Sequence, residues 1–316
     1  MNKQTRARWI TEALTRLLCV VTAALAGCAT TPAPVEQLKY FSQAFAAVNT
    51  VGQPLIDDLA VAERVVARRQ AQLRAKGAPD DKPCSSRDAT WATTGDGKLG
   101  YIDGFCLEHA GYFSTLGDPP ATAQLRGGLR VIERYAEVLT TLAEGRNIEQ
   151  ALGEVDSLGQ EVSGLVALVG APVALVPALT ALQPLLASVA RSSNASEARR
   201  LIVEGAPKVS TLIGKLRDAV PPMFKYLIAD PRRNADNAAT AQAAVEEIEA
   251  RRVVVSLYVV LLGRLQQAWE ATAVAANNPG RSPLTNLVER TAQIKADAET
   301  VRRTLAALRS GTPPAP

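Results

Sequence analysis

The sequence predicts an all-α protein, an elongated helical bundle of long amphipathic helices that carries a small disulfide-stapled hairpin insertion. Two observations lead to this prediction. Apolar residues recur at alternating three- and four-residue spacing through most of residues 38–310, which is the period of one helix face. Strand-like alternation is confined to one short stretch, within 77–115, that also holds two cysteines. We therefore expect one bundle domain over 38–310 with an insertion at 77–115.

The first predicted helix keeps one apolar stripe over 38–73, as in a bundle or coiled-coil helix. Pro54 lies inside this helix just after Gly52, so a kink is expected there. The stripe contains Leu38, Phe41, Phe45, Val48, Gly52, Leu55, Leu59, Ala62, Val66, Arg69 and Leu73.

Helical spacing resumes after Pro119-Pro120. We expect stripes over 125–142 and 152–169, two helices at 195–204 and 207–219 separated by Gly205 and Pro207, and a long helix over 234–277. The run at 253–262 is apolar on all sides, which predicts a helix segment enclosed by its neighbours. The last helix is expected from Ser282-Pro283 to Leu308, and 311–316 is expected to be a disordered tail.

The first 27 residues have the pattern of a processed export signal. Basic residues precede a short apolar segment that ends at Leu25-Ala26-Gly27-Cys28. This stretch resembles the signal peptides of bacterial lipoproteins. The resemblance implies cleavage before Cys28 and attachment of a diacylglyceryl group to its thiol, in a lipid anchor that includes palmitate. Residues 28–37 would then be a tether, and Ala29 after the cysteine favours the periplasmic face of the outer membrane of a Gram-negative cell envelope.

Removal of this segment changes the charge. The whole chain has 35 basic and 31 acidic residues, a net +4, and residues 1–27 contain four basic residues and one acidic residue, a net +3. The mature chain is therefore left with about +1, which gives no support to nucleic-acid binding.

Two of the four cysteines, Cys84 and Cys106, remain after processing and lipidation. In an oxidising compartment this pair is expected to form a disulfide. It would close a hairpin around the Asp96-Gly97 turn. A calcium loop is the alternative, although Ala92 would then stand where an acidic ligand is needed. We expect neither a metal nor a cofactor.

Aromatic residues concentrate around this insertion. Five of the 13 that remain after processing lie within 91–113: Trp91, Tyr101, Phe105, Tyr112 and Phe113. Aromatic side chains on a stapled element are good anchors for a partner, so these five are the candidate partner-binding residues. The alternative is that they close one end of the bundle.

Residues 162–190 carry no charge, which leaves a core helix pair, a wall of an apolar ligand site, or a membrane insertion as interpretations. Pro172, Pro177 and Pro184 argue against a membrane span, because lipid cannot satisfy the backbone groups that prolines leave unbonded. We expect one helix to end near Gly170 and a second to begin near Pro172.

No catalytic constellation is evident in the sequence. His109 is the single histidine, and the Glu108-His109 pair is the one acid-base combination that could be considered. We therefore expect a non-catalytic scaffold or adaptor lipoprotein, held to the membrane by Cys28, with an envelope protein as its partner. The alternative function is a carrier or sensor of an apolar small molecule bound around 162–190.

Overall fold

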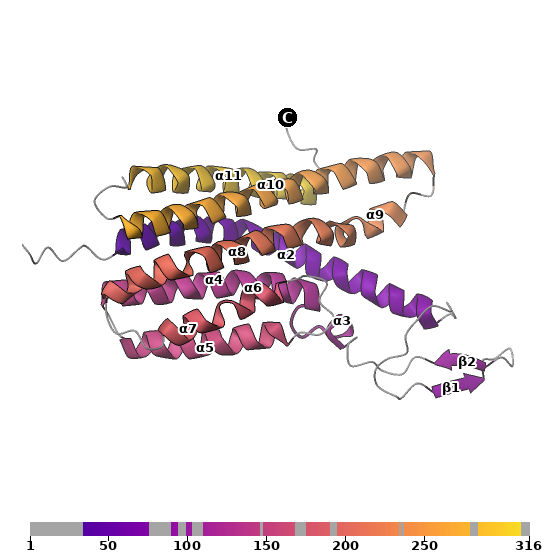
Figure 1. Cartoon of the computed structure of the whole chain (residues 1–316). Coiled ribbons are helices and arrows are strands. Elements are labelled where there is room, and N and C mark those ends of the chain that lie inside the picture. The colour runs from indigo at the N-terminus through magenta and orange to yellow at the C-terminus, as the bar shows by residue number, and fades with distance from the viewer. Residues whose placement is uncertain are drawn as a thin grey trace, which may run out of the picture. The chain divides into compact units, whose positions relative to one another are not determined.

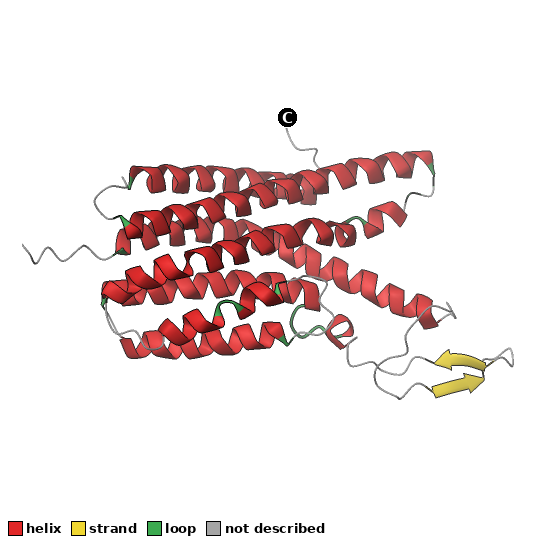
Figure 2. Ribbon diagram, viewed as in Figure 1, coloured by secondary structure: helices red, strands yellow, loops and turns green. Residues whose placement is uncertain are grey.

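The computed structural model describes residues 34–75, 90–93, 99–102, 110–145, 148–167, 175–189, 195–233, 235, 237–278 and 284–310. These residues form an all-α packed bundle in which long helices lie side by side (Figures 1 and 2), as the sequence predicts. The long helices are α2 (Val35–Ala75), α4 (Pro120–Glu144), α5 (Ile148–Val166), α8 (Ala195–Leu227), α10 (Ala238–Asn277) and α11 (Thr285–Ser310). The shorter elements are β1 (Thr90–Thr93), β2 (Leu99–Ile102), α3 (Ala110–Phe113), α6 (Val176–Thr180), α7 (Gln183–Val189) and α9 (Ala229–Arg233).

Helix α4 shows most directly how the sequence specifies an element. Pro120 occupies the first turn, where its missing N–H is no loss, and Gly145 ends the helix at φ 66°, a left-handed conformation that favours glycine. The predicted stripe is confirmed, because all its members are buried: Leu125, Leu129, Ile132, Ala136, Leu139 and Leu142.

Helix α2 is continuous through Pro54. Its predicted stripe is buried as far as Leu59, which is 1% exposed. After Ala60 the next buried residue is Glu63, also 1% exposed, whereas Arg69 reaches the surface and forms an ion pair with Asp230. The prediction that Arg69 belongs to the seam is therefore wrong, and a buried carboxylate occupies this part of the helix face.

The expected break at Gly205 and Pro207 does not occur, because α8 runs unbroken through Pro207 and also through Pro221-Pro222. Two buried aromatic residues donate to carbonyl oxygens in this part of the helix. The Tyr135 hydroxyl donates to the Leu201 carbonyl at 3.1 Å, and the Trp269 indole N–H donates to the Ala206 carbonyl at 3.1 Å. Neither bond serves the Val203 carbonyl, which is the one that Pro207 leaves without a helical N–H donor, so these contacts attach α8 to α4 and α10 but do not compensate for the proline itself.

The C-terminal helices include one correction. Residues 253–262 lie in α10, but they are not enclosed on all sides, since Val253 is 44% and Val260 is 53% exposed. Fewer neighbouring helices surround this segment than its composition predicts. In α11 the predicted stripe is confirmed over most of its length, with Leu287, Thr291, Ile294, Ala298, Val301 and Leu305 buried.

The described residues of the uncharged stretch are largely helical. Helix α5 ends at Val166, and the second predicted helix is divided into α6 and α7. Leu165, Leu175, Leu179 and Leu186 are buried in the bundle. None of the helices in the described part of the chain combines the length and the apolar character that a membrane crossing requires.

The centre of the core lies where α2, α4, α8 and α10 meet. Trp269 of α10 is fully buried there, with its ring centroid 4.9 Å from that of Phe41 and 6.2 Å from that of Tyr135, both in edge-on arrangements. Adjacent glycines in α4 allow close packing of its neighbours. A Cβ on Gly127 would clash with Leu165 of α5, and one on Gly128 would lie 2.7 Å from a methyl carbon of Leu216 of α8.

Strands β1 and β2 pair antiparallel, with Trp91 opposite Tyr101 and Thr93 opposite Leu99. Cys28, Cys84, Cys106 and Phe105 lie outside the described residues. The predicted lipidation, the predicted disulfide and the tail at 311–316 therefore concern parts of the chain that the structure does not describe.

Candidate functional site

The candidate site is the short segment from α3 to the start of α4, which carries Tyr112 and Phe113. Two arginines one turn apart on α2 hold it. The Arg68 Nε donates to the Tyr112 carbonyl at 2.8 Å, and its Nη2 donates to the Phe113 carbonyl at 3.2 Å. Arg64 donates to the carbonyl of Gly117. The carbonyl groups of Tyr112 and Phe113 end a helix too short to satisfy them internally, so the Arg68 guanidinium acts as a C-terminal cap, whereas Arg64 attaches the loop that follows.

Phe113 is 46% exposed, and the guanidinium carbon of Arg68 lies 5.8 Å from its ring centroid. This is cation–π geometry, which fixes the ring without burying it. Tyr112 is half-buried next to it. Burial raises the pKa of Tyr112 to about 12, and the charge of Glu63 adds to this effect, so its hydroxyl stays protonated at neutral pH.

Behind this segment, Glu63 of α2 caps the N-terminus of α4. Its carboxylate accepts from the Ala121 N–H at 3.0 Å, and from both the N–H and the hydroxyl of Thr122 at 2.9 and 2.8 Å. A carboxylate at this position satisfies N–H groups that have no partner within the helix and interacts favourably with the helix dipole. Burial nevertheless raises the pKa of Glu63, and the hydrogen bonds only partly offset that effect.

Arg126 of α4 adds a third attachment to α2. Its guanidinium pairs with Asp118 at 2.6 Å and with Asp57 at 2.7 Å, and it also donates to the side-chain oxygen of Gln53. Burial opposes the charge of Arg126, but its pKa is raised because Asp118 and Asp57 stabilise the cation. The loop between α3 and α4 is thus attached to α2 at both ends.

The five predicted partner-binding residues are only partly located. Tyr112 and Phe113 lie together at the candidate site, whereas Trp91 and Tyr101 are located only as opposed positions of β1 and β2. The residues that hold the site, Glu63, Arg64 and Arg68, are not among those predicted from the sequence. The sequence feature that could have indicated their role is the occurrence of Glu63, Arg64 and Arg68 within two turns at the end of an apolar stripe.

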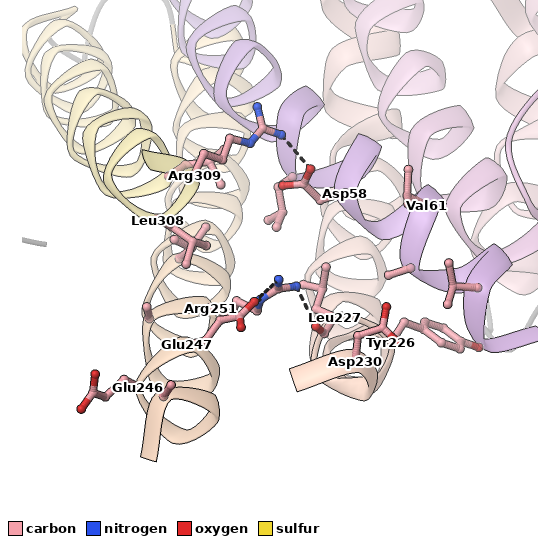
Figure 3. Close-up of a pocket in the computed structure, with 17 residues that line it drawn as sticks. Asp58, Val61, Tyr226, Leu227, Asp230, Glu246, Glu247, Arg251, Leu308 and Arg309 are labelled. Carbon is pink, nitrogen blue, oxygen red and sulfur yellow. Dashed lines mark hydrogen bonds and ion pairs between the residues drawn. The ribbon is translucent and has the colours of Figure 1, made fainter. Parts of the chain in front are cut away.

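A second feature is a groove of about 860 Å³ where α11 ends (Figure 3). It is bounded by α2, the C-terminal end of α8, α9 and the N-terminal half of α10, with Leu305, Leu308 and Arg309 of α11 at one end. A groove of about 680 Å³ lies between α5 and α7. Among the described residues there is no group of three or more His, Cys, Asp and Glu side chains that could hold a metal ion.

Comparisons with protein-family models, with curated proteins and with solved structures give no match to this chain.

Proposed function

We propose that the chain is a lipid-anchored, non-catalytic adaptor that faces the periplasm from the outer membrane and binds an envelope protein through the segment that carries Tyr112 and Phe113. The observation that supports this most is the fixed presentation of an exposed aromatic ring, Phe113, by Arg68. A ring held in one conformation loses little entropy on binding, which favours its use as an anchor.

The membrane attachment is proposed from the Leu25-Ala26-Gly27-Cys28 motif. Mass spectrometry of the chain isolated from envelope membranes tests it directly. The proposal expects a mature N-terminus at Cys28 that carries acyl chains, and loss of membrane association in a Cys28→Ala variant. An N-terminus upstream of Cys28, or an unmodified Cys28 thiol, would contradict it.

A Cys84–Cys106 disulfide belongs to the same proposal, because it would close the segment that contains β1 and β2. The chain mass should be two units lower than that of the reduced chain, a difference that a reducing agent removes. Two free thiols in the chain isolated from the envelope would argue against the stapled insertion and against Trp91, Tyr101 and Phe105 as parts of a rigid binding element.

Partner binding can be tested by placing a photo-crosslinking phenylalanine analogue at position 113 in the full chain. Val288 on α11, which is 41% exposed, is the matched control position. We expect one dominant crosslinked envelope protein from position 113, not from position 288, and its loss when Trp91 and Phe105 are both replaced by alanine. Equal yields from positions 113 and 288 would exclude this surface as the binding site.

A second candidate function is a carrier or sensor of an apolar small molecule. It is favoured by the groove between α5 and α7, which includes the buried side chains of Val155 and Leu186, although Asp156, Gln160 and Gln183 make its lining partly polar. Native and denaturing mass spectrometry distinguish the two functions. An extra mass lost on denaturation would favour the carrier, and a bare polypeptide would favour the adaptor.

A further inference from the structure

The groove at the end of α11 exists because one helix of the bundle is shorter than its neighbours. Leu305, in the last two turns of α11, is buried, and the residues beside it, Leu55 of α2 and Val254 of α10, are 2% and 1% exposed. Past Ser310, α2 continues to Ala75 without this cover. Val61, two turns beyond Leu55, is 61% exposed.

Both walls of the groove keep the spacing of a helix–helix contact face. On α2 the lining positions are Leu55, Asp58, Val61, Ala62 and Val65. On α10 they are Ala243, Glu246, Glu247, Ala250, Arg251 and Val254. Within each set, the positions recur at intervals of three and four residues, as in 58, 61, 62 and 65, so each set forms one stripe along its helix. The same two helices pack against α11 farther along, which places the uncovered stripes on the side where a helix would continue.

The dimensions suit a short helix. The stripe from Ala243 to Val254 extends about 16 Å at the rise of an α-helix, which corresponds to about three turns. Alanine occupies three of the lining positions, Ala62, Ala243 and Ala250, and small residues allow a helix axis to approach to about 8–10 Å. Docking of an amphipathic helix in an apolar groove is a recurrent mode of recognition.

The charged side chains that line the groove indicate which charge a bound helix would carry on its flanks. Four carboxylates line the groove, Asp58, Asp230, Glu246 and Glu247, against the two guanidinium groups of Arg251 and Arg309. Both cations are already engaged: Arg309 pairs with Asp58 at 2.8 Å, and Arg251 pairs with Glu247. Figure 3 shows these two pairs and Glu246 turned away from them.

Of the remaining carboxylates, Asp230 pairs with Arg69 and Arg233, which are not part of the lining, and Glu246 accepts from the amide of Gln242. Once Arg69 and Arg233 are counted, the acidic and basic side chains at the groove balance, and Glu246, whose partner is the amide of Gln242, is the one lining carboxylate without a cation among the described residues. This carboxylate favours a positively charged group of the occupant beside it over a negatively charged one.

We propose that this groove binds an amphipathic helix of a partner protein, about three turns long, with an apolar face and flanking lysine or arginine residues. The apolar face would cover Val61 and Val65 and pack on Ala243 and Ala250, and the basic flank would lie along Glu246. This surface is separate from the Phe113 segment, so the inference goes beyond the proposed adaptor function and does not depend on it.

The test uses two synthetic peptides of about 14 residues, or about four helical turns. Both carry leucines at three- and four-residue spacing, one with lysines and one with glutamates on the flanks. Fluorescence anisotropy with the full chain measures their binding. The lysine peptide should bind at least about tenfold more tightly than the glutamate peptide, and Glu246→Lys should reverse that preference.

Val61→Lys should weaken binding of the lysine peptide at least about fivefold, because it removes an apolar contact and introduces a charge that repels the peptide. Val274→Lys, at a 55% exposed valine in the C-terminal part of α10, is the control and should leave binding unchanged. Equal binding of both peptides, or equal effects of the substitutions at positions 61 and 274, would overturn the proposal. Binding of a fluorescent fatty acid that is sensitive to Val61→Lys, without peptide binding, would assign the groove to a small apolar ligand instead.

Discussion

The guanidinium of Arg68 caps the carbonyl of Phe113 at 3.2 Å and lies 5.8 Å from the centroid of the same residue's ring, although 45 positions separate the two residues in the chain. One side chain of α2 thus fixes both the backbone and the side chain of the exposed aromatic residue. The position of Phe113 is set by α2 rather than by the four-residue helix to which it belongs.

Replacing Arg68 by alanine should release this segment. We expect a loss of about 1–3 kcal/mol in the free energy of unfolding, since two charge-assisted hydrogen bonds to carbonyl groups disappear. Hydrogen exchange should show faster exchange at the backbone amides of residues 110–117. Arg302→Ala, at a side chain that is 66% exposed, is the control, and it should leave the free energy of unfolding nearly unchanged. Unchanged exchange at 110–117 in Arg68→Ala would show that Arg68 does not hold Phe113.

The buried Glu63 predicts a pH dependence of stability. Burial raises its pKa above the ordinary value of 4.5, so the folded protein binds this proton more tightly than the unfolded chain does. The resulting stabilisation is fully present below pH 4.5, the pKa expected for the unfolded chain, and is lost as the pH rises through the raised pKa of the folded state.

Glu63→Gln removes this titration. The free energy of unfolding of the wild type, minus that of the variant, should therefore be larger at pH 4.5 than at pH 7.5, as measured by urea denaturation. Glu36→Gln removes a carboxylate that is 55% exposed from the same helix and controls for the general effect of surface charge. A difference that grows with increasing pH would mean that the hydrogen bonds from Ala121 and Thr122 outweigh burial.

The glycine pair of α4 gives a prediction about packing. Gly128→Ala would place a Cβ about 2.7 Å from Leu216, so α4 and α8 must separate or Leu216 must change its conformation. We expect a destabilisation of about 1–3 kcal/mol. Gly153→Ala on α5 is the matched control, because that Cβ meets nothing within 4 Å and alanine is the better helix former. It should stabilise the protein by up to about 1 kcal/mol, and destabilisation of similar size at both positions would contradict the packing argument.

Two buried tyrosines differ in one hydrogen bond. The Tyr135 hydroxyl donates to the Leu201 carbonyl, whereas the Tyr258 hydroxyl has no hydrogen-bond partner among the described residues. Burial raises the pKa of both hydroxyl groups, so both are neutral across the ordinary pH range. Tyr135→Phe should therefore lower the free energy of unfolding by about 1 kcal/mol, and Tyr258→Phe should leave it unchanged or raise it. Thermal unfolding of the two variants checks this, and a larger loss in Tyr258→Phe would reveal a partner for that hydroxyl.

The sequence predicts the helices of the bundle well where a single apolar stripe determines which face is buried. The stripes of α4 and α11 are buried as expected, because apolar spacing is a local property that the tertiary structure has no reason to override. It predicts α8 poorly because the residues that attach this helix to its neighbours, Tyr135 and Trp269, are more than 60 positions from Pro207 and give no local signal. A proline therefore does not by itself predict a break in a helix that packs against several neighbours.

The candidate site shows the same limit. The aromatic concentration that includes Tyr112 and Phe113 is visible in the sequence, but the role of Arg68 is not. Arg68 bonds to backbone carbonyl groups, which every residue has, so its partners cannot be identified from residue types. Glu63 was likewise hidden, since a carboxylate that caps another helix looks like any charged position next to an apolar stripe.

The pairing of the first and last helices has a consequence for how the chain reaches its native state. Thr291 and Lys295 of α11 bond to Tyr40 and Gln43 of α2, and Arg309 bonds to the Pro54 carbonyl, which is 255 positions earlier in the chain. Contacts of such separation form late, because nearly the whole chain must be closed into a loop before they contribute. The side of α2 that faces α11 therefore stays uncovered until the last helix has been synthesised, although α4, α8 and α10 cover the rest of its apolar surface. A chain shortened by the last helix would expose that side of α2.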